Sequence, residues 1–136
     1  MLSNTTEALT SAVLHTETIT ITQTTLVEVS FHLGVNILQN NETFASDGMP
    51  RLYDALVSHV GSGDYIVCNS GSYTNEQTTE TITTGYFTLS GNGFIELAPG
   101  MHQFEMLGFA NGSVSQGYRV EFGANAIKRF QFIFNN

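Results

Sequence analysis

One alternating stretch decides the fold: Val27-Glu28-Val29-Ser30-Phe31-His32-Leu33-Gly34-Val35. Apolar side chains occupy every second position of this stretch, and polar side chains fill most positions between them. Ile19 and Ile21 share the apolar phase before a short interruption at residues 23–25. Because successive side chains of a strand point to opposite faces, this period of two predicts one or two half-buried strands over a core.

The rest of the chain repeats this pattern of short strands and turns. Strands are predicted at residues 65–68, 82–89, 94–97, 101–109, 114–122 and 130–134. Residues 90–93, Ser-Gly-Asn-Gly, have the composition of a hairpin turn, and residues 98–100, Ala-Pro-Gly, predict a second turn. Dense threonine also favours strands, because β-branched side chains pack well on a pleated surface. Closely spaced strands with turns between them predict an antiparallel sandwich or barrel.

Residues 50–60 are the one helix candidate. Leu52, Leu56 and Val60 recur at a spacing of four, Pro50 suits a first helical turn, and Gly61 would end the helix. A strand stays open as the alternative, because the same apolar residues fit either period.

Residues 1–15 show no clear period and predict an N-terminal arm, with a single β-sandwich domain over residues 16–136. Four apolar side chains of the arm are candidates for docking on a neighbour: Leu2, Leu9, Val13 and Leu14.

Composition excludes several classes of partner. The 136 residues carry four Lys and Arg against twelve Asp and Glu, a formal charge of −8, which leaves no basic surface for nucleic acid. No apolar run approaches the length of a membrane span, and the first residues do not resemble a secretory signal. We therefore expect no nucleic acid and no membrane as partner, and synthesis in a host cytoplasm.

Catalytic motifs are equally scarce. The four histidines, His15, His32, His59 and His102, are scattered, whereas a catalytic zinc or iron site needs about three converging ligands. Cys68 lies in an apolar strand and is expected to be a buried small hydrophobe. No G-x-S-x-G motif or phosphate-binding loop occurs. The sequence predicts a protein that is not an enzyme and has no cofactor, although a pair of carboxylates could still meet in space.

Aromatic residues are the most informative side chains. There are ten Phe and no Trp, and the Phe residues concentrate in the C-terminal half. In the last predicted strand Phe130, Phe132 and Phe134 share one face, and Ile133 lies on the other. They fit a sandwich core, or a contact between subunits made by Phe130, Phe132, Ile133, Phe134 and Tyr118.

Residues 93–106, Gly-Phe-Ile-Glu-Leu-Ala-Pro-Gly-Met-His-Gln-Phe-Glu-Met, form a strand–turn–strand unit. With the aromatic closing strand, they make the chain from Tyr65 onward resemble the trimeric jelly rolls of the tumour-necrosis-factor and complement-head type. Versions of that fold are found in phage fibres, spikes and capsid decorations. The resemblance implies an all-β, antiparallel, jelly-roll-like β-sandwich whose last strand lies beside a threefold axis, and it carries over no catalytic residue.

Three functions follow as hypotheses. The first is a structural virion protein, a homotrimeric capsid decoration (cement) or head-fibre module that binds the major capsid protein or another virion protein through its arm. The second is a bacterial surface adhesin or carbohydrate-binding module that binds a cell-surface glycan. The third is a small cupin-like or glycosidase-like enzyme.

Overall fold

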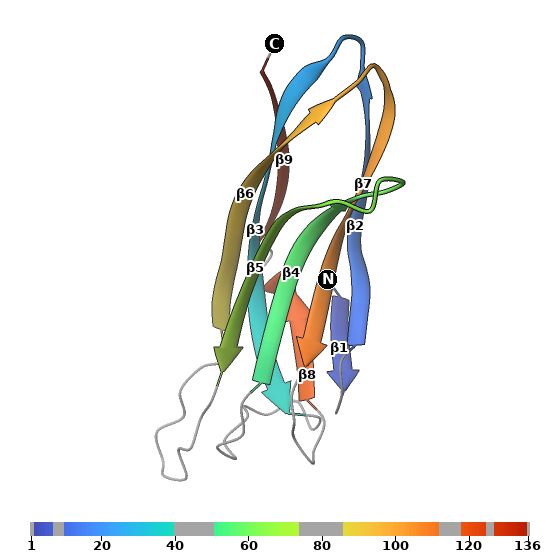
Figure 1. Ribbon diagram of the computed structural model, residues 1–136. Coiled ribbons are helices and arrows are strands. Elements are labelled where there is room, and N and C mark those ends of the chain that lie inside the picture. The colour runs from blue at the N-terminus through green and yellow to red at the C-terminus, as the bar shows by residue number, and fades with distance from the viewer. Residues whose placement is uncertain are drawn as a thin grey trace.

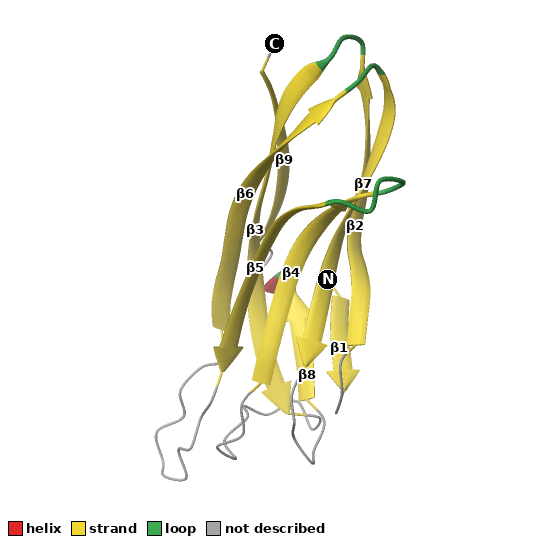
Figure 2. Cartoon of the chain, viewed as in Figure 1, coloured by secondary structure: helices red, strands yellow, loops and turns green. Residues whose placement is uncertain are grey.

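The computed structural model describes residues 2–6, 10–39, 51–73, 86–111, 118–124 and 127–135, almost all of them in strands (Figures 1 and 2). The strands are β1 (Leu2–Thr6), β2 (Thr10–Ile21), β3 (Thr25–Gln39), β4 (Arg51–His59), β5 (Tyr65–Tyr73), β6 (Tyr86–Leu97), β7 (Gly100–Asn111), β8 (Tyr118–Phe122) and β9 (Lys128–Asn135). The prediction of an all-β protein is confirmed. Among the described residues there is no helix long and apolar enough to cross a membrane.

Two antiparallel sheets pack face to face. The first sheet has the order β1-β8-β3-β6, with β9 also paired to β3, and the second has the order β2-β7-β4-β5. Strands that follow one another in sequence alternate between the sheets in most of the chain, so the polypeptide winds around the core. This order is that of a jelly roll, and it confirms the predicted antiparallel, jelly-roll-like β-sandwich.

Strand β3 is the centre of the first sheet. It pairs with β6 along one side, and with β9 and then β8 along the other. At the junction, the N–H of Gly34 donates to the carbonyl of Ile127 over 2.8 Å, and the N–H of Gly123 donates to the carbonyl of Gly34 over 2.7 Å. A Cβ at position 34 would collide with the carbonyl oxygen of Ala124, so glycine is required for this close approach.

The core lies between the two sheets, and the alternating apolar residues of β3 point into it as the sequence indicated. The apolar side chains of β3, Val27, Val29, Phe31, Leu33 and Val35, are all buried. From the second sheet, Val57, Phe104 and Met106 pack against them and are completely buried. The alternation read from β3 therefore identifies the inner face of the first sheet.

The helix predicted at residues 50–60 is wrong, because β4 occupies this segment. Strand β4 pairs with β5 on one side and β7 on the other, so it is an interior strand. Tyr53, Ala55 and Val57 face the core, and Leu56 on the opposite face is also buried. A spacing of four residues is two periods of a strand, so the Leu52–Leu56 repeat did not distinguish the two structures.

The turn predicted at residues 90–93 is also wrong, since these residues lie within the continuous strand β6. Gly91 and Gly93 instead let β5 approach closely: a Cβ at position 93 would collide with the carbonyl oxygen of Ile66, and one at position 91 would press on Val67. The turn predicted at residues 98–100 is present, with Gly100 at φ 139°. Residues 82–85 and 114–117 of two predicted strands lie outside the described residues.

The predicted N-terminal arm is part of the sandwich. Strand β1 pairs with β8 in the first sheet, and β2 pairs with β7 in the second. A register shift between Val13 and His15 places Leu14 in the core at 8% exposure, while Val13 stays outside. This bulge changes the phase within β2 and conceals its alternation in the sequence. The side chain of Leu2 and all of Leu9 lie outside the described part of the chain.

Candidate interaction surfaces and a histidine pair

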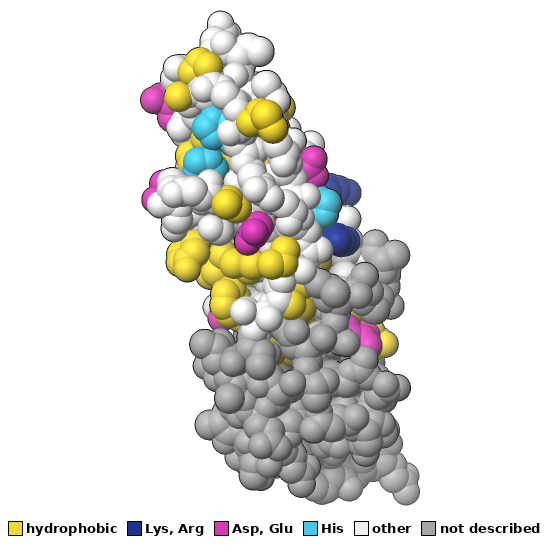
Figure 3. Space-filling view, turned by 90° about the vertical axis from the view of Figure 1, so that its right-hand side faces the viewer, with side chains coloured by type: hydrophobic (Ala, Val, Ile, Leu, Met, Phe, Trp, Pro, Cys, Tyr) yellow, Lys and Arg dark blue, Asp and Glu magenta, His cyan; other side chains and the backbone are white. Residues whose placement is uncertain are grey.

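The outer face of the second sheet carries an apolar band. Strand register aligns Val13, Leu107, Leu56 and Cys68 in one row across β2, β7, β4 and β5. Leu52, which is 42% exposed, and the half-buried Phe109 extend the band in the neighbouring rows. Figure 3 shows hydrophobic side chains running across the face of the molecule. We refer to these six residues as the apolar band.

The charges near the apolar band are acidic. Asp54 and Glu105 point outward from β4 and β7, and no Lys or Arg lies on this face among the residues that the structure describes. Partial burial raises the pKa of Asp54. Cys68 is exposed, which corrects the expectation of a buried thiol. Partial desolvation raises the pKa of the Cys68 thiol, and the nearby charge of Asp54 raises it further, so the reactive thiolate is disfavoured.

The residues of β9 that were predicted to form a subunit contact lie partly in the core and partly on the surface. Phe130 and Phe132 point inward and are partly buried, with the Phe132 ring 5.1 Å from that of Phe104. Ile133 and Phe134 are 41% and 47% exposed. Tyr118 does not join them, because it lies on β8 opposite Gln39, at the other end of β3; its side chain is outside the description.

The free edge of β9 carries positive charge. Strand β9 pairs with β3 alone among the described strands, so its other edge is open. Lys128 and Arg129 are both exposed at its start, and the ammonium of Lys128 donates to the carbonyl of Leu14 over 3.1 Å. Basic side chains appear at one margin of the view in Figure 3. Edge strands with charged side chains resist uncontrolled pairing with other chains.

His59 and His102 lie in contact, although 43 positions separate them in sequence. The Nε2 of His59 lies 3.0 Å from the Nδ1 of His102, and the ring of Phe104 packs on His59 with centroids 5.1 Å apart. Sequence reasoning missed this pair, because His59 ends β4 and His102 lies near the start of β7. Antiparallel pairing of these two strands brings the two positions together.

The other two histidines have separate surroundings. The Nε2 of His15 lies 2.8 Å from a carboxylate oxygen of Glu17, and the ring of Phe130 meets His15 edge-on. His32 lies opposite Arg129 on the first sheet. In the described ranges no three His, Cys, Asp or Glu side chains gather in a way that could hold a metal ion.

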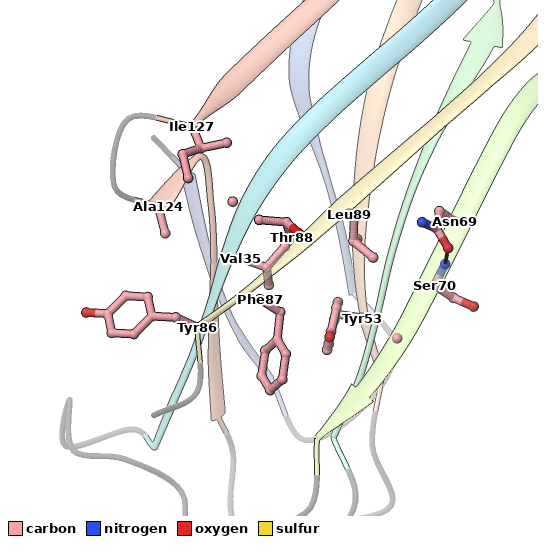
Figure 4. Close-up of a pocket in the computed structure, with 12 residues that line it drawn as sticks. Val35, Tyr53, Asn69, Ser70, Tyr86, Phe87, Thr88, Leu89, Ala124 and Ile127 are labelled. Atoms are coloured by element: carbon pink, nitrogen blue, oxygen red, sulfur yellow. Dashed lines mark hydrogen bonds between the residues drawn. The ribbon is translucent and has the colours of Figure 1, made fainter. Parts of the chain in front are cut away.

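A cleft of about 570 Å³ opens near the lower ends of β5 and β6 (Figure 4). Its aromatic lining includes Tyr53 and Phe87, whose rings stack with centroids 5.7 Å apart, and the exposed Tyr86. Asn69 and Ser70 supply neutral polar groups from β5. The amide of Asn69 already donates to the carbonyl of Ser90 over 2.7 Å, so part of this polarity is used within the protein.

Comparison with solved structures matches 98% of this chain to a chain in the structure of infectious bursal disease virus Gx strain, at 11% identity and a TM-score of 0.50. The likeness is one of fold. The match covers 32% of the viral chain, so the present chain is much shorter than that protein. No protein-family model and no curated protein matches the sequence. A fold shared with a chain of a virus structure agrees with the coarser part of the sequence-based resemblance; the trimeric tumour-necrosis-factor type stays an expectation.

Proposed function

We propose that this protein is a non-catalytic structural virion protein that assembles as a homotrimer and decorates a capsid, as a cement protein or a head-fibre module. The observation that carries the proposal is the apolar band on the outside of a jelly-roll sandwich. A stable soluble protein rarely leaves such a band open, so a permanent neighbour explains it. The fold likeness to a chain of a virus structure supports the virion as the setting.

The charges favour a head-to-tail contact between copies. If two copies met through the same face, Asp54 and Glu105 of one would lie against those of the other, which is unfavourable. The exposed cations Lys128 and Arg129 instead lie at the start of β9, and Ile133 is exposed farther along the same strand. We therefore pair the β9 edge of one copy with the apolar band of the next. A head-to-tail contact forms a closed ring when the rotation from one copy to the next divides a full turn evenly. We propose a ring of three copies.

The first experiment is the molar mass of the purified chain by size exclusion with light scattering. We expect three times the mass of one chain at micromolar concentration. A standard-size interface takes roughly 800 Å² from each partner, so the contact has to cover the residues around the apolar band as well as the band itself. A monomer at every concentration contradicts the homotrimer.

The second experiment tests whether the protein is a component of a virus particle. If the chain decorates a capsid, its peptides should be present at a fixed ratio to the major capsid protein in purified virus particles from its source. Absence from such particles contradicts the virion role, even if the protein is a trimer. Attachment through an N-terminal arm is not part of the proposal, because β1 and β2 belong to the sandwich.

The cleft of Figure 4 favours a carbohydrate-binding module as the second candidate. Aromatic faces with neutral hydroxyl and amide groups suit a neutral glycan better than a charged ligand. A glycan array tests it: binding that is lost in Tyr86→Ala, at the exposed ring, supports this function, and an array without binding contradicts it.

A further inference from the structure

A chain of hydrogen-bonding groups runs between two turns of the sandwich. Ser62 Oγ, in the β4–β5 turn, lies 2.7 Å from Nδ1 of His59. His59 Nε2 then lies 3.0 Å from Nδ1 of His102, and His102 Nε2 lies 2.7 Å from the carbonyl oxygen of Ala98, in the β6–β7 turn. Both turns lie in the half of the molecule where β9 ends (Figure 1).

The chemistry of these groups determines which atom donates and which accepts in each of the three hydrogen bonds. The carbonyl oxygen of Ala98 only accepts, so His102 must carry a hydrogen on Nε2. The Nδ1 of a neutral His102 then accepts from the Nε2–H of His59, and the Nδ1 of His59 accepts from the hydroxyl of Ser62. Each ring nitrogen has a partner of the right kind when both histidines are neutral.

The geometry favours a shared hydrogen over a shared metal ion. The ring centroids of His59 and His102 are 5.2 Å apart, close to the largest separation that a 3.0 Å contact between ring nitrogens permits. The two nitrogens therefore lie nearly on the line between the ring centres. With the nitrogens at this separation, a metal bound to both would need the two lone pairs to converge on a point off this line, which these ring orientations do not provide.

This series of hydrogen bonds can accept one added proton without breaking, but it cannot accept two. With one proton on Nδ1 of His59, that nitrogen donates to Ser62 Oγ, and the hydroxyl can turn toward the carbonyl of His59, 3.4 Å away. A second proton on Nδ1 of His102 makes both facing nitrogens donors and sets two positive rings in contact. The hydrogen bond between the rings is then lost.

Several titratable groups lie on the elements around the pair. Burial and then His102 lower the pKa of His59, and Asp64 in the β4–β5 turn opposes them only in part. Glu17 on β2 is engaged by His15, and Glu105 on β7 points to the outer face. On the first sheet, Glu28, Glu96 and Arg129 lie in outward positions of β3, β6 and β9.

We propose that His59 and His102 form a pH-sensitive connection between the β4–β5 and β6–β7 turns, closed near neutral pH and released when the second proton binds in mildly acidic solution. Backbone bonds limit the response to the turns: the N–H of Val60 donates to the carbonyl of Gln103 over 2.9 Å, and that of His59 to the carbonyl of Asp64 over 2.9 Å. The strands stay paired while the turns are released. This proposal does not depend on the trimer.

Hydrogen exchange by NMR tests the connection. In the wild type, protection of the backbone N–H groups in the β4–β5 turn and at Ala98 should fall about ten-fold between pH 7.5 and pH 5, on the order of what one lost side-chain hydrogen bond contributes. His102→Phe keeps a ring but removes the acceptor, so its turns should be weakly protected at both pH values. His32→Phe, on the other sheet, is the matched control and should keep the wild-type response.

Two results would overturn the proposal: protection in the wild type that does not change with pH, or the same change in His102→Phe. If His102→Phe does not fold, the ring ¹⁵N shifts of the wild type decide instead. A hydrogen-bonded pair titrates in two coupled steps separated by more than about one unit, while independent rings titrate separately near their usual pKa.

Discussion

The outer faces of the two sheets differ in what they leave exposed. On the second sheet, the apolar band crosses all four strands, with acidic residues beside it. On the first sheet, the middle row is Asn92, Ser30 and Gln131, and the exposed apolar side chains Leu26, Phe94 and Ile133 lie nearer one end. A neutral polar row loses little by staying in water, whereas the apolar band gains from being covered. In the proposed head-to-tail contact, the outer face of the second sheet therefore supplies one side, and β9 of the first sheet supplies the other.

The largest expected effect comes from charges placed in the apolar band. Val13→Asp with Leu52→Asp should convert the proposed trimer to a monomer, because two carboxylates would be desolvated in the contact. Both native side chains are more than 40% exposed, so the sandwich itself should tolerate the changes. Light scattering gives the mass, and circular dichroism checks the fold. The matched control is Asn92→Asp on β6, on the side of the first sheet away from β9; if it dissociates the protein equally, the comparison between the faces is wrong.

An engineered disulfide between two copies can identify which surfaces of the protein meet in the trimer. Cys68 is the single cysteine and lies at one end of the band row. In the head-to-tail contact, Ile133→Cys on β9 of one copy should reach the neighbourhood of Cys68 on the next, and oxidation should give linked dimers and trimers on a non-reducing gel.

The control for this cross-link is the double variant Cys68→Ser with Ile133→Cys, which should give no trimers. Two outcomes would distinguish the proposed trimer from the proposed contact through β9. A trimer by light scattering without cross-linked species rejects the β9 contact and leaves the trimer standing. Efficient Cys68–Cys68 dimers in the wild type would instead favour two copies meeting by the same face.

A smaller effect is expected from Leu56→Ala. This residue belongs to the band, yet it is only 8% exposed in the single chain, because its neighbours cover it. Removing it should cost about 2 kcal/mol or more of unfolding free energy, whereas Ser30→Ala on the first sheet should change it by less than about 0.5 kcal/mol. Urea unfolding measures both. Equal values would show that the two outer faces contribute alike to stability.

The smallest effect concerns Asp54. Its pKa is raised in the folded protein, so the folded state holds its proton more tightly than the unfolded chain does. The associated stability is present below the unfolded pKa and is lost as pH rises through the folded pKa. Asp54→Asn should therefore be more stable than the wild type at pH 7, and the difference should shrink by pH 3. A constant difference across this range would exclude burial of the carboxylate as its cause.

Much of the fold could be predicted from the sequence, because β3 keeps a strict period of two and buries every apolar position of it. The prediction failed where that period was disturbed. In β2, the bulge near Leu14 shifts the phase, and in β4 a side chain on the outer face is buried as well, which imitates a helical spacing. Gly91 and Gly93 were interpreted as a turn, although they serve the close approach of β5.

The candidate sites were harder to predict, since they depend on register. Ile133 lies on the face of β9 opposite to Phe130 and Phe132, as the alternation indicated, but no local pattern showed that Phe132 would contact Phe104, or Phe130 contact His15, from the other sheet. The six residues of the apolar band come from four strands, with at most two from any one strand, so no single strand reveals the band. The pair of His59 and His102 exists only because β4 and β7 pair in one register.

The strand order has a consequence for synthesis on the ribosome. Among the described strands, β4 and β5 alone are both consecutive and paired; every other pairing joins segments far apart in the chain. Strand β1 has to wait for β8, and β2 for β7, before either gains its hydrogen bonds. Contacts between distant segments make folding slow, and the sandwich can close only after the segments from β1 to β8 have all been synthesised. Most of its apolar surface is available to chaperones until then.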